Sequence, residues 1–280
     1  MQTYIVVADA FTRFADKLSL RRYSDLLAAL RQGQATELRG KRFVAGQGLD
    51  DPHIDHLYCL ALSKGLDAEF RHWRQWRSRP MVAMAACHKH RAENVLITEP
   101  QCIEPGLYLA DLVLHARNEL MQDHLTGEHI QGMVLAEACR QMFLAVTELH
   151  GLQDFTPAAR YFVIHEMAIR YLAFAFPLPA QVRYCLRRQE QVRPDRLAIE
   201  ADIEVWQCEQ VAAEMRVSFE VFDGAILAAR ESQLARVAVE RSLSELSCQV
   251  EAPSTPRESA PDLASEAVPH PRAAHAAQPA

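Results

Sequence analysis

The sequence has no surplus of positive charge, no long uncharged apolar run and no basic segment at its start. Its 280 residues carry 30 Lys and Arg against 36 Asp and Glu, a formal net charge of -6. Nucleic-acid binding needs a basic surface that displaces counterions from phosphates, so we expect no nucleic-acid partner. A membrane helix requires about 18 or more apolar residues without charge, and none occurs. The start, MQTYIVVADAF, lacks the basic flank of a secretory signal. We therefore expect a cytoplasmic protein with no membrane partner.

The cysteines and the short catalytic motifs exclude further classes. Seven scattered cysteines without a CxxC pair favour buried, reduced thiols over a disulfide scaffold or a zinc ribbon. CHKH, from Cys87 to His90, would attract a metal, but neighbouring residues in a strand point to opposite faces and no second cluster completes a tetrahedron. DPHIDH, from Asp51 to His56, is typical of a helix start. Neither a G-x-S-x-G turn nor a P-loop occurs. We predict no metal and no cofactor.

Residues 1–75 have the pattern of a small α/β module. TYIVV and RFVAG predict strands, and residues 18–30 and 52–66 predict helices, in a β-α-β-α order. The GQG at Gly46 to Gly48 follows the second strand. It favours a tight strand-to-helix turn over a phosphate loop, because the third glycine of a phosphate-binding fingerprint is missing.

Residues 81–240 predict a second domain, rich in antiparallel strands. RLAIEADIEVW and VAAEMRVSFEV alternate apolar and polar residues, as half-buried strands do. Further strands are expected at ENVLIT, LYLADLVL, RYFVIHEMAIRYLAFAF and QVRYCLRRQEQV, and Asp223-Gly224 predicts a hairpin into AILAAR. One helix packed on such a sheet gives an α+β layer architecture. Residues 251–280, rich in Pro, Ala and Ser, predict a disordered tail.

The one long helix of this domain, from about Gly132 to Leu149, is apolar around most of its circumference, which is typical of a central helix. Its narrow polar stripe consists of Glu137, Arg140, Gln141, Thr147 and Glu148. A carboxylate on such a helix is costly unless it is paired or used. Glu137 therefore either pairs with Arg140 one turn on, closes a subunit interface, or takes part in catalysis.

The loop before this helix favours catalysis. Asp123, His124 and His129 come just ahead of it, and Gly132 lets a ligand approach the backbone closely. The N–H groups of the first helical turn have no partners within the helix, so they suit an oxygen that becomes negative at a thioester carbonyl. This combination indicates acyl chemistry.

Two stretches resemble the A-factor biosynthesis (AfsA-like) hotdog family: HKHRAENVLIT, from His88 to Thr98, and DHLTGEHIQGMVLAEACRQ, from Asp123 to Gln141. The resemblance covers roughly residues 81–230. It implies the hotdog fold, a curved antiparallel sheet around a central helix. This chain shows a single hotdog domain, preceded by the small α/β module. The segment GMVLAEA is also similar to the helix start of β-hydroxyacyl-carrier-protein dehydratases, although the proline-flanked histidine of those enzymes is missing here.

The resemblance also implies an activity. AfsA-like proteins are similar to a tandem of two hotdog units and are thought to transfer a β-ketoacyl group from acyl carrier protein to dihydroxyacetone phosphate, on the way to butyrolactone signals. By this comparison Glu137 is the general base, and His124, or else His129, orients substrate or moves a proton. The residues assigned to substrate binding are Gly132, Met133, Arg140 and His88.

The partners expected from the resemblance are acyl carrier protein or acyl-CoA, a small hydroxylated acceptor and a second copy of the chain. We expect a homodimer because one hotdog unit leaves a sheet edge and helix surface uncovered. Two alternatives stay open: hydrolysis or dehydration of acyl thioesters, and a non-catalytic hotdog that binds an acyl chain or a partner.

The stretch EFRHWRQWRSRP, from Glu69 to Pro80, interleaves tryptophans with arginines. One interpretation is a helix that joins the domains and faces Arg71, Arg74 and Arg77 to water. The other is a basic docking patch, which also includes Arg79, for an acidic partner such as a carrier protein.

Overall fold

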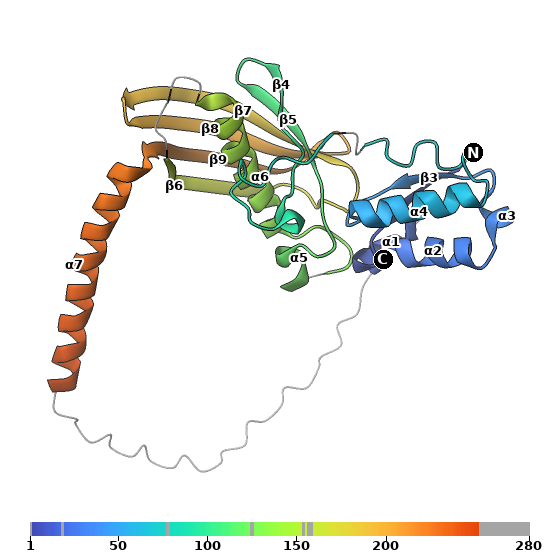
Figure 1. The fold of residues 1–280 in the computed structure, drawn as a ribbon, viewed down its shortest axis with the longest axis horizontal. Helices are drawn as coiled ribbons and strands as arrows, with labels where there is room; N and C mark the ends of the chain where they lie inside the picture. Colours follow the sequence, from blue (N-terminus) through green and yellow to red (C-terminus); the bar gives the residue numbers. More distant parts are fainter. Residues whose placement is uncertain are drawn as a thin grey trace, which may run out of the picture. The chain divides into compact units, whose positions relative to one another are not determined.

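The structure of the protein, a computed structural model, is drawn in Figure 1 and divides into two compact units, Met1–Ala228 and Ala229–Ala280. It describes residues 2–17, 20–76, 79–123, 126–152, 155 and 159–251. Residues 252–280 lie outside this range, so the disorder expected of the tail stays a prediction. Among the described residues, no helix has the length and the apolar character needed to cross a membrane.

The N-terminal module is α/β, as the sequence predicted, and its parallel sheet has a third strand in addition to the two that were expected. Its strands lie in the order β2-β1-β3 and are β1 (Thr3–Val7), β2 (Leu20–Arg22) and β3 (Arg42–Ala45). Its helices are η1 (Asp9–Phe11), α1 (Thr12–Ala15), α2 (Tyr23–Arg31), α3 (Ala35–Leu38) and α4 (Asp51–Ser63). The Asp50 side chain caps α4 by accepting the His53 N–H at 2.9 Å.

One predicted helix in this module is wrong at its start. Residues 18–30 were expected to be helical, but residues 20–22 form β2 and α2 begins at Tyr23. Leu20 lies beside Ile5 of β1 in the parallel register, so its backbone takes part in the sheet. Pairing between distant segments overrides the local pattern here.

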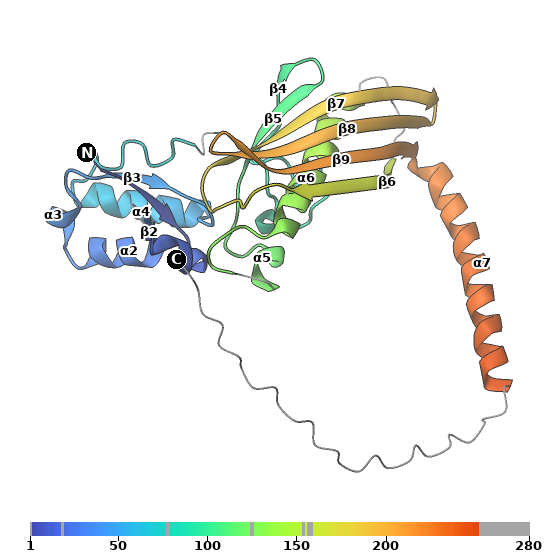
Figure 2. The ribbon, with the colours of Figure 1, turned by 180° about the vertical axis from the view of Figure 1, so that it is seen from behind.

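The second part of the chain is a six-stranded antiparallel sheet in the order β4-β5-β7-β8-β9-β6, seen from two sides in Figures 1 and 2. Its strands are β4 (Gln101–Glu104), β5 (Leu107–Leu112), β6 (Arg160–Tyr171), β7 (Ala180–Arg193), β8 (Arg196–Gln207) and β9 (Gln210–Asp223). Helix α6 (Gly132–Val146) contacts four of them, β5, β7, β8 and β9. The α+β architecture, with one helix against a curved sheet, is therefore confirmed.

The core lies between α6 and the sheet. Leu197, Ile199 and Val205 of β8 are buried, as are Val217 and Phe219 of β9, so the alternation seen in the sequence is confirmed. The helix itself buries apolar side chains around most of its circumference: Val134, Leu135, Ala138, Cys139, Met142, Phe143, Leu144, Ala145 and Val146. After Val146 the chain continues in one wider turn, the π-helix Thr147–Gly151.

Two local predictions in this part are wrong. ENVLIT forms no sheet strand, because Ala92–Asn94 is a short 3₁₀ helix and the chain then makes only isolated bridges. Asp223-Gly224 starts no hairpin, because Gly224 begins helix α7 (Gly224–Glu251). The Asp223 carboxylate accepts the Ala225 N–H at 2.9 Å and thus caps the helix. Aspartate is favoured both at helix N-termini and in turns, so the sequence alone does not distinguish the two.

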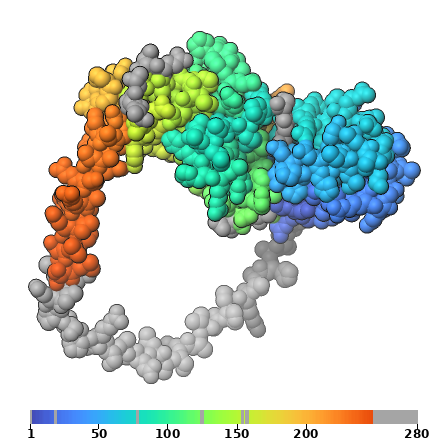
Figure 3. Space-filling view, in the orientation of Figure 1, coloured from blue at the N-terminus to red at the C-terminus, as the bar shows by residue number. Residues whose placement is uncertain are grey.

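The module and the sheet domain are joined by a buried glutamine. Gln47, in the middle of the GQG turn, donates to the Leu112 carbonyl at 2.7 Å and accepts the Leu114 N–H at 2.8 Å. Next to it, His115 Nε2 lies 3.2 Å from the Asp50 carboxylate. The GQG is therefore a turn, as expected, and it binds a strand of the sheet. The surfaces of the blue module and the teal and green segments meet in Figure 3.

Candidate functional site

Helix α6 begins at a pocket of about 530 Å³. Gly132 is the first residue of the helix, so its backbone is part of the pocket wall. The other lining residues come from the loop before α6 and from the end of β6 and the segment that follows it: His129, Ile130, Leu135, Tyr171, Leu172, Ala173, Phe174 and Ala175. The pocket is mostly apolar and lies at the N-terminal end of the helix, where the first N–H groups have no partners within the helix.

Tyr171 covers the first turn of α6. A Cβ added to Gly132 would lie 2.8 Å from Cζ of the Tyr171 ring, so only glycine lets the ring pack this close. Burial raises the pKa of the Tyr171 hydroxyl, which therefore stays protonated at neutral pH. Tyr171 carries no distinguishing signal in the sequence, because it stands among many apolar strand residues.

His129 is the loop histidine that the structure places in this pocket. Its Nδ1 lies 3.4 Å from Thr126 Oγ1, and its ring lies against the exposed ring of Phe174 with the centroids 5.0 Å apart. His124 and the side chain of Asp123 lie outside the described residues. Of the two candidate histidines, His129 alone belongs to the described residues, and it lines the pocket.

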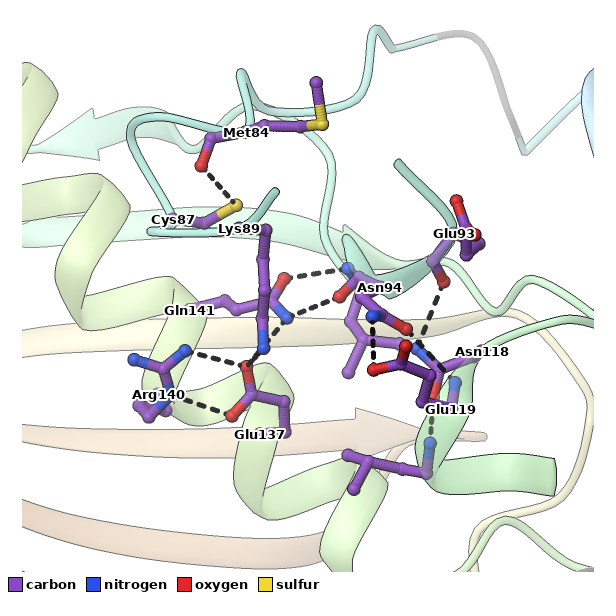
Figure 4. A network of polar contacts seen from close by, with 12 residues as sticks. Met84, Cys87, Lys89, Glu93, Asn94, Asn118, Glu119, Glu137, Arg140 and Gln141 are labelled. Carbon is purple, nitrogen blue, oxygen red and sulfur yellow. Dashed lines mark hydrogen bonds and ion pairs between the residues drawn. The ribbon is translucent and has the colours of Figure 1, made fainter. Parts of the chain in front are cut away.

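Glu137 does not line this pocket but stands in a polar network on another side of α6 (Figure 4). Its carboxylate accepts from Arg140 Nε at 2.8 Å and from Gln141 Nε2 at 3.0 Å, and lies 2.6 Å from Lys89 Nζ. Pairing with Arg140, one of the interpretations left open by the sequence, is therefore observed. Lys89 was missed as a partner, although it lies inside the quoted stretch HKHRAENVLIT.

The network holds Glu137 as an anion. Burial alone would raise the pKa of its carboxyl, but the hydrogen bonds from Arg140, Lys89 and Gln141 outweigh burial and leave the pKa below its ordinary value. Two cations face one carboxylate, so the cluster has a surplus of positive charge.

The pH dependence of stability should report this ion pair. A carboxyl whose folded pKa is lowered stabilises the fold above its unfolded pKa, and that contribution is lost as the pH falls through the folded pKa. We expect Glu137→Gln to lower the free energy of unfolding by about 1.5–3 kcal/mol at neutral pH. The difference from wild type should stay constant down to the ordinary carboxyl pKa of 4.5 and shrink below it. Urea unfolding of both proteins across this range measures it, and a difference that grows in acid would contradict the assignment.

Gln141 explains why a polar side chain persists on the buried part of α6. It is fully buried, accepts the Leu96 N–H at 2.8 Å and donates to the Asn94 carbonyl at 2.8 Å. The Asn94 side chain in turn binds Glu119 of the short helix α5 (Glu119–Asp123), by donating to its carboxylate at 2.9 Å. Gln141 therefore fixes the backbone of the segment that brings Lys89 to Glu137.

The remaining predicted residues lie apart from the pocket. His88 has a φ of 54°, its Nε2 lies 3.4 Å from the Glu148 carboxylate, and its ring packs on Phe162. Met133 is 60% exposed on the first turn of α6. The structure thus brings together His129 of the loop with Gly132 at the start of α6, and, separately, Glu137 with Arg140 further along the helix.

The fold and these groups define the chain as a hotdog protein, with its central helix between an apolar pocket and an ionic network. A family model, the A-factor biosynthesis hotdog domain, matches residues 76–223, which is more than half of the chain. The chain belongs to this family. No curated protein sequence matches it.

Solved structures resemble the chain only at low identity. Conserved protein PA5202 from Pseudomonas aeruginosa has 18% identity and a TM-score of 0.33, over 44% of this chain and 87% of that one. A mutant of thioesterase PA1618 from the same organism has 13% identity and a TM-score of 0.36, over 52% and 97%. A hypothetical thioesterase with coenzyme A from Streptococcus pneumoniae has 14% identity and a TM-score of 0.35, over 50% of this chain and 98% of that one. Likenesses this weak support no inference about activity.

Proposed function

We propose that this protein is an acyl-thioester enzyme that transfers a (β-keto)acyl group from acyl carrier protein or CoA to a small hydroxylated acceptor. The product would be a butyrolactone-type signal or a related metabolite. The observation that carries the proposal is the apolar pocket that opens onto the first turn of α6, with Gly132 in its wall and His129 beside it. Membership of the A-factor biosynthesis hotdog family supports the acyl chemistry.

The acyl chain lies in the pocket, and its thioester carbonyl oxygen faces the N–H groups of the first helical turn. The Val134 N–H already bonds to the Gln131 carbonyl at 3.1 Å, so Gly132 and Met133 provide the donors. Such donors stabilise the negative charge that develops on the oxygen when the acceptor hydroxyl attacks. The acceptor oxygen then forms an ester bond to the acyl carbon, the carbon–sulfur bond breaks, and the hydroxyl proton passes through the general base to the leaving thiolate.

The acceptor approaches from the side of α6 that carries Glu137. The acceptor extends from this network to the first turn of α6, so that Glu137, ionised at neutral pH, takes the proton of the attacking hydroxyl. Lys89 and Arg140, which pair with Glu137 in the structure, hold an anionic part of the acceptor. His129 orients the acyl group in the pocket. His88, whose Nε2 lies 3.4 Å from the Glu148 carboxylate, is proposed to contribute to substrate binding beside Lys89.

The proposed dimer rests on the edge of the sheet. β6 is the last strand of the sheet and exposes Tyr161, Ile164 and Tyr171. An uncovered strand edge with exposed apolar side chains favours pairing with a second copy of the chain.

Release of free thiol tests the proposal. A β-ketoacyl thioester is incubated with the purified protein, with and without dihydroxyacetone phosphate as the acceptor probe, and the thiol is followed by mass spectrometry. Transfer predicts release that depends on the acceptor. Equal release without acceptor would instead show a thioesterase, and tight binding without release a non-catalytic hotdog protein. A β-hydroxyacyl thioester, given in a separate reaction, would yield an enoyl product if the protein were a dehydratase.

Gly132→Ala should reduce turnover without unfolding the protein. The added Cβ would displace the tip of the Tyr171 ring, which can move because half of the residue is exposed. We expect a loss of up to about 10²-fold in kcat/KM, since small misplacements at a reacting centre have effects of this size. In a Tyr171→Ala background the same substitution should have little further effect. Full additivity of the two substitutions would contradict this contact.

A further inference from the structure

The sheet carries a second pocket, of about 780 Å³, on the face opposite α6. Leu107, Leu109 and Asp111 of β5 line it, and they alternate with Ala110 and Leu112, which are buried on the helix side. Its volume is in the range of small-molecule sites. The other lining residues are Gln75, Trp76, Arg79, Pro179, Ala180, Gln181, Arg183, Trp206, Gln207, Cys208 and Glu209.

The basic stretch from Glu69 to Pro80 contributes three of these residues, Gln75, Trp76 and Arg79. It forms turns, not the helix that one interpretation predicted. Trp73 is buried, with its Nε1 donating to the Ile54 carbonyl at 3.0 Å, and Arg74 pairs with Asp55. Arg77 lies outside the described residues. Trp76, whose Nε1 donates to the Ala45 carbonyl of β3, and Arg79 both line the pocket.

The polar groups of the pocket include a donor and an acceptor side by side. Arg79 Nε lies 3.6 Å from the Asp111 carboxylate, and Arg79 Nη1 is buried and finds no hydrogen-bond acceptor among the described residues. A buried donor without a partner is unfavourable, so an oxygen atom of a ligand would satisfy it. The Asp111 carboxylate beside it suits a hydrogen bond donated by a hydroxyl group of the ligand. Its negative charge disfavours an anionic ligand.

The charges that line the pocket also favour a neutral ligand. The charged lining residues are Arg79 and Arg183 on one hand, Asp111 and Glu209 on the other, so the pocket has no surplus of either sign. Two indole rings and two leucines make up much of the remaining wall. We propose that this pocket binds a neutral small molecule that carries a carbonyl and a hydroxyl group on an apolar body. Arg79 donates to the carbonyl, Asp111 accepts from the hydroxyl, and the apolar body lies between Trp76 and Trp206. The site is independent of the proposed acyl transfer.

Tryptophan emission gives a selective test, because two of the three tryptophans line this pocket and none lines the pocket at α6. The probes are methyl 3-hydroxydecanoate, which is neutral, and 3-hydroxydecanoate, which has the same chain and a carboxylate. The proposal predicts a saturable change with the ester and at least about tenfold weaker binding of the acid. Equal or tighter binding of the acid, or no saturable change with the ester, would overturn it.

Variants locate the binding. Arg79→Met should weaken ester binding about tenfold, the effect of losing a hydrogen bond from a charged donor. Leu109→Gln, which keeps every charge, should weaken it as well and provides a second variant if the first fails to fold, as judged by thermal unfolding. Arg170→Met is the matched control: its guanidinium is exposed, pairs with Glu214 and does not line the pocket. Loss of binding in the control equal to that in Arg79→Met, or no loss in either pocket variant, would refute the assignment.

Discussion

Glu137→Gln is expected to lower acyl transfer by about 10²- to 10⁴-fold, the usual contribution of a general acid or base. The amide keeps the size of the side chain but cannot take the proton of the acceptor hydroxyl. It also leaves Lys89 and Arg140 without the carboxylate that they now share. The measurement is kcat/KM for a β-ketoacyl thioester, with thermal unfolding of both proteins to confirm folding.

Glu220→Gln is the matched control for this experiment. Glu220 is also a buried carboxylate that accepts from an arginine, Arg196, and its pKa is likewise lowered, burial being outweighed by its hydrogen bonds. It lies on β9 and touches neither group on α6. We expect a loss of stability in both variants but a loss of turnover in Glu137→Gln alone. Wild-type turnover in Glu137→Gln would remove the base from the mechanism and leave Glu137 as the partner of two cations.

Gln141→Leu is expected to lower the free energy of unfolding by about 2–5 kcal/mol. The substitution leaves the Leu96 N–H and the Asn94 carbonyl without their partners, and each buried unpaired group costs about 1–3 kcal/mol. Leucine has a similar volume, so a cavity contributes little. Urea denaturation measures the effect.

Gln189→Leu is the comparison for this second variant. Gln189 is an exposed glutamine of β7 whose side chain donates to the Gly151 carbonyl at 3.0 Å. Exposed substitutions of this kind change stability by about 0.5 kcal/mol or less. If both variants lost the same stability, Gln141 would not hold the segment from Asn94 to Leu96, and the account of Lys89 placement would be wrong.

The sequence predicted those features of the fold that depend on local periodicity. The alternation in β8 and β9 and the apolar circumference of α6 follow from which faces are buried, and periodicity records burial directly. The pair Glu137 and Arg140 is one helical turn apart, so it was also visible. Two of the local errors, at residues 20–22 and at Asp223-Gly224, arise where a short segment is compatible with two local structures.

The contacts between distant segments at the candidate site could not be predicted from local periodicity in the sequence. Lys89 reaches Glu137, and Gln141 reaches Asn94, only because the segment before β4 folds over α6. Separations of this length leave no periodic signal. Tyr171 reaches Gly132 from the far end of β6, and Trp76 reaches the outer face of β5 in the same manner.

The most direct test of the central claim is the mass of the product. The purified protein is given a β-ketoacyl thioester with a ¹³C-labelled acyl group and dihydroxyacetone phosphate, and the products are analysed by mass spectrometry. The account predicts one ester that contains both the labelled acyl group and the acceptor, and its absence from the Glu137→Gln reaction. Labelled free acid as the sole product, or an unchanged thioester, would contradict it.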